Sequence, residues 1–149
     1  MLKNTFRTLV QAQAETIWGL LAEGMEHPGK YRQGVEEAKI VERFDDGVLR
    51  ELRYRGKLFR ERLVADRKGH ELRCELVEHP LFTGSMVAKL AQTSVQNPMA
   101  PVYLEYIIDF ERRSFQLEGV LQAEEELAAD IRGEMAFLKG KAEELEKRG

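Results

Sequence analysis

Charged side chains occupy several positions where the sequence pattern otherwise places apolar ones. On alternating segments they are Glu42, Arg50, Glu61 and Glu78, and in an apolar helical stripe Glu124. A charge in an apolar interior is costly unless it is paired or protonated. We expect Arg50 to lie opposite Glu42 and diagonal to Glu61. Glu124 is either paired with Arg50, wetted through the mouth of a cavity, or held neutral with a raised pKa. Such groups either form structural ion pairs that close a cavity, or anchor a ligand in an apolar pocket.

Two tyrosines, Tyr54 and Tyr106, fall on the same apolar face. Each brings a large apolar ring and a hydroxyl that needs a hydrogen-bond partner when it is buried. The hydroxyl either bonds the backbone inside a packed core or bonds a ligand. In an enzyme, Tyr106 would act as a donor beside Glu61 or Glu124 as acid or base.

The remaining reactive residue types carry little signal. Cys74 is the only cysteine, and His27, His70 and His79 show no HxxxH or HxH spacing, so we expect neither a disulfide nor a metal site. Cys74 has no histidine beside it in the expected sheet, which is typical of inert packing. The sequence contains no P-loop, nucleophile elbow or dinucleotide fingerprint. We therefore expect no cofactor, and no residue is assigned as catalytic.

Length, net charge and the distribution of apolar residues limit the kinds of partner that the protein can bind. A chain of 149 residues is long enough for one domain, residues 1–149, with a core of its own. The formal net charge of −3 argues against nucleic acid as a partner, because phosphate binding depends on clustered positive charge. The sequence shows no signal-peptide pattern and no apolar run long enough to insert into a membrane, which predicts a cytoplasmic protein.

A long amphipathic helix is predicted over 114–149. Its apolar residues recur at spacings of three and four, and a helix of about thirty residues is about 45 Å long, so the rest of the chain must cover its stripe. The stripe is Leu117, Val120, Leu121, Leu127, Ala128, Ile131, Met135, Leu138, Ala142 and Leu145. On the other side, Gly133, Gly140 and Phe137 suggest a homodimer contact as one alternative and ordinary exposed residues as the other.

The preceding chain reads as strands and short helices. A strand over 3–11 is followed by a helix ending near Gly24 and His27-Pro28, and by a short second helix or turn. From Gly34 the period is two, as in strands. The expected strands are 35–44, 48–55, 58–67, 70–79, 82–93 and 102–112.

Turn residues fix the expected register of these strands. Asp45-Asp46-Gly47 suits a three-residue loop with glycine left-handed, and Gly56-Lys57 and Lys68-Gly69 suit two-residue loops. This register places one apolar set on a single face, and a slip of one residue would turn the whole set to solvent. The set is Ala38, Ile40, Phe44, Val48, Leu52, Tyr54, Phe59, Leu63, Ala65, Leu72, Cys74 and Leu76, followed by Val102, Leu104, Tyr106, Ile108 and Phe110.

Local motifs add a family resemblance. They are Trp18-Gly19-Leu20-Leu21, Pro28-Gly29-Lys30-Tyr31, Leu49-Arg50-Glu51-Leu52, Phe59-Arg60-Glu61-Arg62-Leu63 and Tyr103-Leu104-Glu105-Tyr106. With this order of elements, the chain resembles the START-like (SRPBCC) superfamily, which includes birch-pollen-allergen relatives, and within it the AtaL-like branch. The resemblance implies an α+β helix-grip fold, in which a curved seven-stranded antiparallel sheet wraps around the long C-terminal helix. Two short helices follow the first strand of this fold. It also implies a hydrophobic cavity between sheet and helix.

These observations favour a protein that binds or carries a small hydrophobic or amphipathic molecule. The alternatives are an enzyme of the same fold, such as a cyclase, hydratase or isomerase, and a regulator that binds a partner through the exposed face of the long helix. The predicted ligand-binding residues are Arg50, Leu52, Tyr54, Phe59, Glu61, Leu63, Cys74, Met86, Tyr106, Ile108, Glu124, Ala128, Ile131 and Met135.

Overall fold

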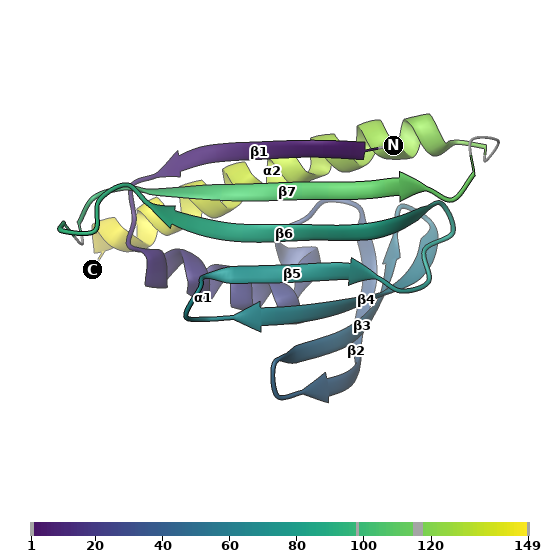
Figure 1. The fold of residues 1–149 in the computed structure, drawn as a ribbon, viewed down its shortest axis with the longest axis horizontal. Coiled ribbons are helices and arrows are strands. Elements are labelled where there is room, and N and C mark those ends of the chain that lie inside the picture. Colours follow the sequence, from purple (N-terminus) through teal and green to yellow (C-terminus); the bar gives the residue numbers. More distant parts are fainter. Residues whose placement is uncertain (1, 98, 115–117, 149) are drawn as a thin grey trace.

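A seven-stranded antiparallel sheet curves around one long helix (Figure 1). The computed structural model describes residues 2–97, 99–114 and 118–148. The strand order is β1-β7-β6-β5-β4-β3-β2, and both helices lie on one face of the sheet. The elements are β1 (Leu2–Val10), α1 (Ala14–Glu26), η1 (Pro28–Lys30), β2 (Val35–Phe44), β3 (Gly47–Tyr54), β4 (Lys57–Asp66), β5 (Glu71–Leu76), β6 (Phe82–Gln92), β7 (Val102–Arg112) and α2 (Val120–Arg148). The predicted fold class is confirmed.

Helix α1 follows from its apolar spacing. Ile17, Trp18, Leu20 and Leu21 are buried, and Pro28 follows His27, the residue that caps the C-terminal end of the helix. Proline cannot continue a helix because it lacks the N–H group and clashes with the preceding turn. The predicted second short helix is the three-residue 3-10 turn η1.

Helix α2 buries most of the predicted stripe. The buried members are Val120, Leu127, Ala128, Ile131, Met135, Leu138 and Ala142. Leu121 and Leu145 are exposed, contrary to prediction. Val120, at the first position of the helix, is buried, so Leu121 is exposed because it lies on another side of the helix and not because the helix ends there. Leu117 lies outside the described residues.

The far end of α2 holds the connection between β1 and α1. Glu143 accepts a hydrogen bond from the backbone N–H of Gln11, at 2.9 Å. Glu146 accepts one from the N–H of Gln13, at 3.0 Å, and one from the Thr16 hydroxyl, at 2.6 Å. Segments about 130 residues apart in sequence are thereby joined.

The inner face of β7 is as predicted. Val102, Leu104, Tyr106, Ile108 and Phe110 are all buried, and outward residues alternate with them. The hairpin between β4 and β5 also has its predicted register, with Leu63 opposite Cys74 and Ala65 opposite Leu72. These two segments show that turn residues and period together can fix a register.

The hairpin between β3 and β4 turns one residue earlier than predicted. Tyr54 pairs with Lys57, so the loop is Arg55-Gly56, and both loop residues have positive φ, 47° and 80°. That conformation is typical of a type I′ turn. Each residue of β3 pairs with a residue of β4 two positions from the predicted one. Because side chains alternate with a period of two, the same residues still face inward. Arg50 moves from a diagonal position to one directly opposite Glu61.

The hairpin between β2 and β3 differs more. Phe44 pairs with Gly47, which leaves a two-residue loop, and Gly47 does not adopt the predicted left-handed conformation. A side chain on Gly47 would meet the carbonyl oxygen of Leu63 at 1.9 Å, so glycine is needed there for close approach rather than for φ.

A register shift between Ile40 and Glu42 reverses the two faces of β2 between this point and the end of the strand at Phe44. Glu42 pairs with Leu49, not with Arg50, and is exposed, and Phe44 is also exposed. The predictions that Glu42 and Phe44 face inward are therefore wrong. Ala38, further along this edge strand, is exposed as well, because β2 lies at the sheet's edge.

Strand β5 is shorter than predicted and ends at Leu76. Glu78, expected to face inward, is exposed, and His79 is buried in its place, with 8% of its surface accessible. The described residues contain no helix with the length and apolar character to span a membrane, and no cluster of three or more His, Cys, Asp or Glu side chains suited to a metal ion.

Candidate functional site

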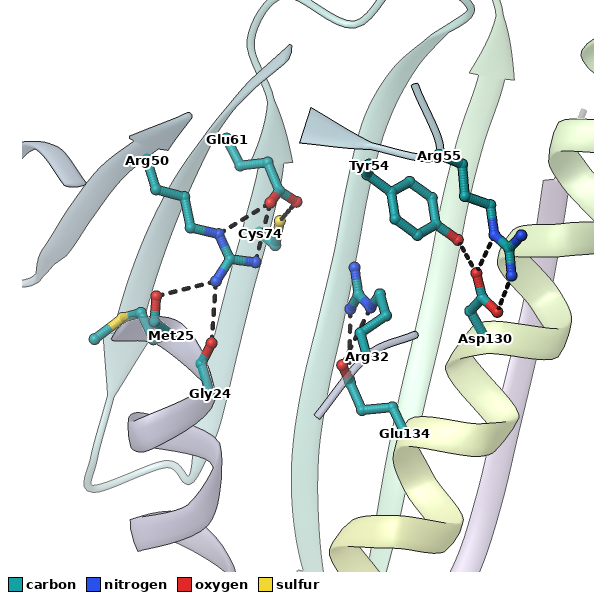
Figure 2. Close-up of polar contacts among 10 residues, drawn as sticks. All are labelled: Gly24, Met25, Arg32, Arg50, Tyr54, Arg55, Glu61, Cys74, Asp130 and Glu134. Atoms are coloured by element: carbon teal, nitrogen blue, oxygen red, sulfur yellow. Dashed lines mark hydrogen bonds and ion pairs between the residues drawn. The ribbon is translucent and has the colours of Figure 1, made fainter. Parts of the chain in front are cut away.

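A buried ion pair joins β3 to β4 beneath helix α1. The Arg50 guanidinium donates to Glu61 from Nε, at 3.0 Å, and its Nη1 donates to the carbonyl oxygens of Gly24 and Met25, at 3.1 and 3.0 Å (Figure 2). Those carbonyls belong to the last turn of α1, where the helix has no N–H groups left for them and favours a positive charge. Arg50 thus closes α1 onto the sheet while it neutralises Glu61.

Glu61 is held as a carboxylate. Burial would raise its pKa, but the Arg50 and Arg32 guanidinium groups hold the pKa below its usual value. The Cys74 thiol donates to the other carboxylate oxygen. Burial, together with the Glu61 charge, raises the pKa of Cys74 well above its usual value. Cys74 is therefore a neutral thiol and a poor nucleophile, as the sequence predicts.

A second buried pair, Arg32 with Glu134, was not predicted from the sequence. Arg32 lies between η1 and β2, and its Nε and Nη2 donate to the two carboxylate oxygens of Glu134 on α2, at 3.1 and 3.4 Å (Figure 2). The Tyr106 hydroxyl hydrogen-bonds to Glu134, and burial followed by this carboxylate raises the pKa of Tyr106. Glu134 lies between Ile131 and Leu138 at stripe spacing, a signal that was available. Arg32 is in an irregular segment and carries no such signal.

A third polar cluster lies further along α2. Asp130 accepts hydrogen bonds from the Tyr54 hydroxyl and from Nε and Nη2 of Arg55, the latter two at 2.7 and 2.8 Å (Figure 2). Burial raises the pKa of Tyr54, and the hydrogen bond to Asp130 adds to that rise. Tyr54 therefore has a side-chain partner on the helix, where the sequence suggested the backbone or a ligand.

Glu124 is paired with Arg112, so two of its alternatives, pairing with Arg50 and a neutral carboxyl with a raised pKa, are wrong. Nε and Nη2 of Arg112 each donate to Glu124 at 2.9 Å. The Arg112 hydrogen bonds are the main cause that lowers the pKa of Glu124 to about 2. Arg112 ends β7 and Glu124 lies in the first turns of α2, which places the pair at the end of the sheet and away from Arg50.

Two small cavities lie between the sheet and the helices. The first, about 50 Å³, is lined mainly by apolar side chains, among them Leu20, Leu21, Leu63, Leu72, Ala88 and Leu138. The second, about 30 Å³, is half apolar, with Phe59, Leu76, Phe82, Phe110, Ala123 and Leu127, and half polar, with Arg32, Tyr54, Arg55, Lys57, Glu61, His79 and Glu126. Arg32 and Met86 line both cavities and so form the boundary between them.

The predicted ligand-binding residues divide into groups. Those that line the first cavity are Arg50, Leu63, Cys74, Met86 and Tyr106. Those that line the second are Tyr54, Phe59, Glu61 and Met86. The residues that line neither of these cavities are Leu52, Ile108, Glu124, Ala128, Ile131 and Met135, most of them packed in the core. Whether any of them binds a ligand stays a prediction.

Comparison with known proteins identifies the fold. No family model matches the chain, and no curated protein matches its sequence. Among solved structures, a START superfamily protein from Mycobacterium smegmatis aligns with a TM-score of 0.74 and 16% identity, over 97% of this chain and 99% of that one. The protein XoxI from Bacillus cereus aligns with a TM-score of 0.71 and 16% identity, over 98% and 99%.

A third match carries a stated activity. The Zhui aromatase/cyclase from Streptomyces sp. R1128 aligns with a TM-score of 0.67 and 18% identity, over 95% of this chain and 93% of that chain. At these identities the likeness concerns architecture. The chain has the START-like (SRPBCC) helix-grip fold, as the resemblance in its sequence predicts, and a fold by itself does not decide a function.

Proposed function

We propose that this protein binds a small amphipathic molecule between the sheet and helix α2. The observation that supports this most is the presence of two buried ion pairs, Arg50–Glu61 and Arg32–Glu134, beside one mainly apolar cavity and one cavity with mixed apolar and polar walls. Buried ion pairs are often no more stabilising than apolar residues of the same size, so stability alone is a weak reason for them. Charged groups at the edge of an apolar space can orient the polar end of a ligand.

Binding in this site requires the interior to open. Pockets for small molecules have volumes of about 300–1,000 Å³, whereas the two cavities have about 50 and 30 Å³. Met86 separates them, and methionine side chains are flexible and adapt to new shapes. A ligand that binds the opened form would shift the population toward it.

An enzyme of the same fold is the second candidate, favoured by the likeness to an aromatase/cyclase. A cyclase, hydratase or isomerase would use Glu61 or Glu124 as acid or base and Tyr106 as donor. An efficient general acid or base has a pKa near the working pH. The pKa of Glu61 is lowered and that of Glu124 is about 2, so both are weak bases. We therefore favour binding over catalysis.

Two narrower expectations stay predictions. The AtaL-like branch rests on the sequence motifs, and a cytoplasmic location rests on the sequence pattern. The third candidate, a regulator that uses the outer face of α2, has weaker support. Phe137 on that face is half covered, because its ring meets the edge of the Tyr31 ring at 5.5 Å.

The proposal is tested at the boundary between the cavities. Met86→Ala should join the two cavities and strengthen binding of the apolar dye N-phenylnaphthylamine, measured by fluorescence titration, whereas Met86→Phe should weaken it. Met86→Ala should also cost about 2–5 kcal/mol of stability, so binding is measured where each variant is folded. Met99→Ala, at a residue that is 70% exposed, is the matched control. Unchanged binding in both Met86 variants would place the ligand site elsewhere or remove it.

A further inference from the structure

His79 is the one histidine held inside the sheet's concave side. It lies between β5 and β6, before Pro80, and is 8% exposed. Its ring packs against the rings of Phe59 and Phe82, with centroids 4.5 and 5.2 Å away. The Arg113 guanidinium donates to its carbonyl oxygen at 3.1 Å. The ring is therefore fixed on two sides and lines the second cavity.

The hydrogen bonds of this ring define its tautomer. Nδ1 accepts from the backbone N–H groups of Leu81 and Phe82, at 3.0 and 3.2 Å. Nδ1 therefore carries no proton, and in a neutral imidazole the proton is then on Nε2. Burial lowers the pKa of His79 to about 4, which keeps the ring neutral at physiological pH.

Nε2–H is a donor without a partner in the part of the chain that the structure describes. The hydrogen bonds of the His79 side chain all go through Nδ1. Several other polar groups that line the second cavity are already engaged. Tyr54 and Arg55 bond Asp130, and Glu61 bonds Arg50. No buried side-chain nitrogen or oxygen of the described residues lacks a partner, so Nε2 lies where solvent reaches it, and an acceptor on a ligand can take the place of water there.

We propose that the second cavity binds a neutral aromatic compound through its carbonyl oxygen, which accepts a hydrogen bond from Nε2–H of His79. Aromatic side chains, Phe59, Phe82 and Phe110, supply the walls for a flat ring. A neutral donor supplies no charge to offset the cost of burying an anion, which favours an uncharged acceptor. Lys57, which also lines this cavity and is half-buried, would instead favour an anion. The inference rests on the proposed function, because a ring-sized ligand needs the interior to open at Met86.

Three probes separate these possibilities. Acetonaphthone carries a carbonyl, ethylnaphthalene has a methylene in its place, and naphthoate carries a charge. Each is titrated as a competitor of N-phenylnaphthylamine. One neutral hydrogen bond should make acetonaphthone bind about 3- to 10-fold more tightly than ethylnaphthalene. Naphthoate should bind less well than acetonaphthone.

Two substitutions test the acceptor Nδ1 and the donor Nε2–H of the His79 ring separately. In His79→Asn the amide oxygen takes the place of Nδ1 and keeps the bonds to Leu81 and Phe82, while the donor into the cavity is lost. In His79→Gln the longer side chain places its amide N–H near the position of Nε2, and the bonds to the backbone are lost. We expect the ketone preference to disappear in His79→Asn and to persist in His79→Gln, which should be the less stable variant. His27→Asn, at an exposed histidine that also precedes a proline, is the matched control.

The outcomes are distinguishable. A ketone preference unchanged in His79→Asn, or tighter binding of naphthoate that does not depend on His79, overturns the role of His79 and leaves the proposed function standing. Absence of binding by all probes in the wild type overturns both. If neither variant folds, nitrogen NMR of the wild-type imidazole decides. Acetonaphthone should shift the Nε2 signal more than ethylnaphthalene, and equal shifts overturn the proposal.

Discussion

Removal of Arg50 should expose the cost of the buried charge that it neutralises. The side chains of Arg50 and Glu61 are 5% and 3% exposed, so Arg50→Met leaves an unpaired carboxylate in the interior. Breaking a buried ion pair on one side costs about 3–5 kcal/mol. Arg32 also stabilises the Glu61 charge, which places the expected loss near the lower end, about 3 kcal/mol. Two carbonyl groups of α1 lose their donor as well.

The loss should depend on pH with a definite sign. In the wild type the pKa of Glu61 is lowered, so its contribution is complete above the unfolded value and is lost only as the pH falls through the folded value. Without Arg50, burial dominates and the folded pKa rises above the unfolded one. As the pH falls, protonation of Glu61 then removes the unpaired buried charge. The penalty of Arg50→Met should therefore be smaller at pH 5 than at pH 7.

Urea unfolding of matched variants measures both effects. Arg53→Met, on the outer face of the same strand, should change stability by less than about 0.5 kcal/mol. The double variant Arg50→Met with Glu61→Leu should recover about half of the loss or more, and its penalty should be the same at pH 5 and 7. A loss below about 1 kcal/mol, or a loss in Arg50→Met that does not change with pH, would refute the reasoning.

Two other predictions use the packing. Gly47→Ala should destabilise the protein by about 1–3 kcal/mol, because the added Cβ would meet the Leu63 carbonyl oxygen. Gly133→Ala, with open space around it, should stabilise the protein by about 1 kcal/mol. Urea unfolding measures both changes, and changes of the same sign would contradict the close approach at Gly47. Cys74 should react with iodoacetamide far more slowly in the folded protein than in urea, as measured by mass spectrometry, and rapid labelling of the folded form would show that its burial is wrong.

The sequence predicted those parts of the fold whose pattern is long. The stripe of α2 and the alternation of β7 each repeat several times, so a single exception does not change the interpretation. The edge strand β2 was read less well, because one bulge reversed the faces of Glu42 and Phe44. A bulge inserts a residue without changing composition, and the periodic pattern contains no mark of it.

The candidate site was predicted only in part for a similar reason. Arg50 and Glu61 were found because they interrupt an alternating pattern, and the structure places them opposite each other. Arg32 lies in a segment without a period, so nothing in the sequence indicates that it enters the core. The position of His79 depends on where β5 ends, and strand ends are set by tertiary contacts rather than by local spacing.

The pairing of β1 with β7 sets the order in which the fold can be completed. Residues 2–10 leave the ribosome about a hundred residues before their partner strand, residues 102–112. Until then, β1 presents an unpaired edge, and contacts this distant in sequence form slowly. The bonds from Glu143 and Glu146 to the chain after β1 come later still. We expect that in nascent chains stopped before β7, strand β1 has no partner strand. Such chains should depend on chaperones until α2 packs against the curved sheet.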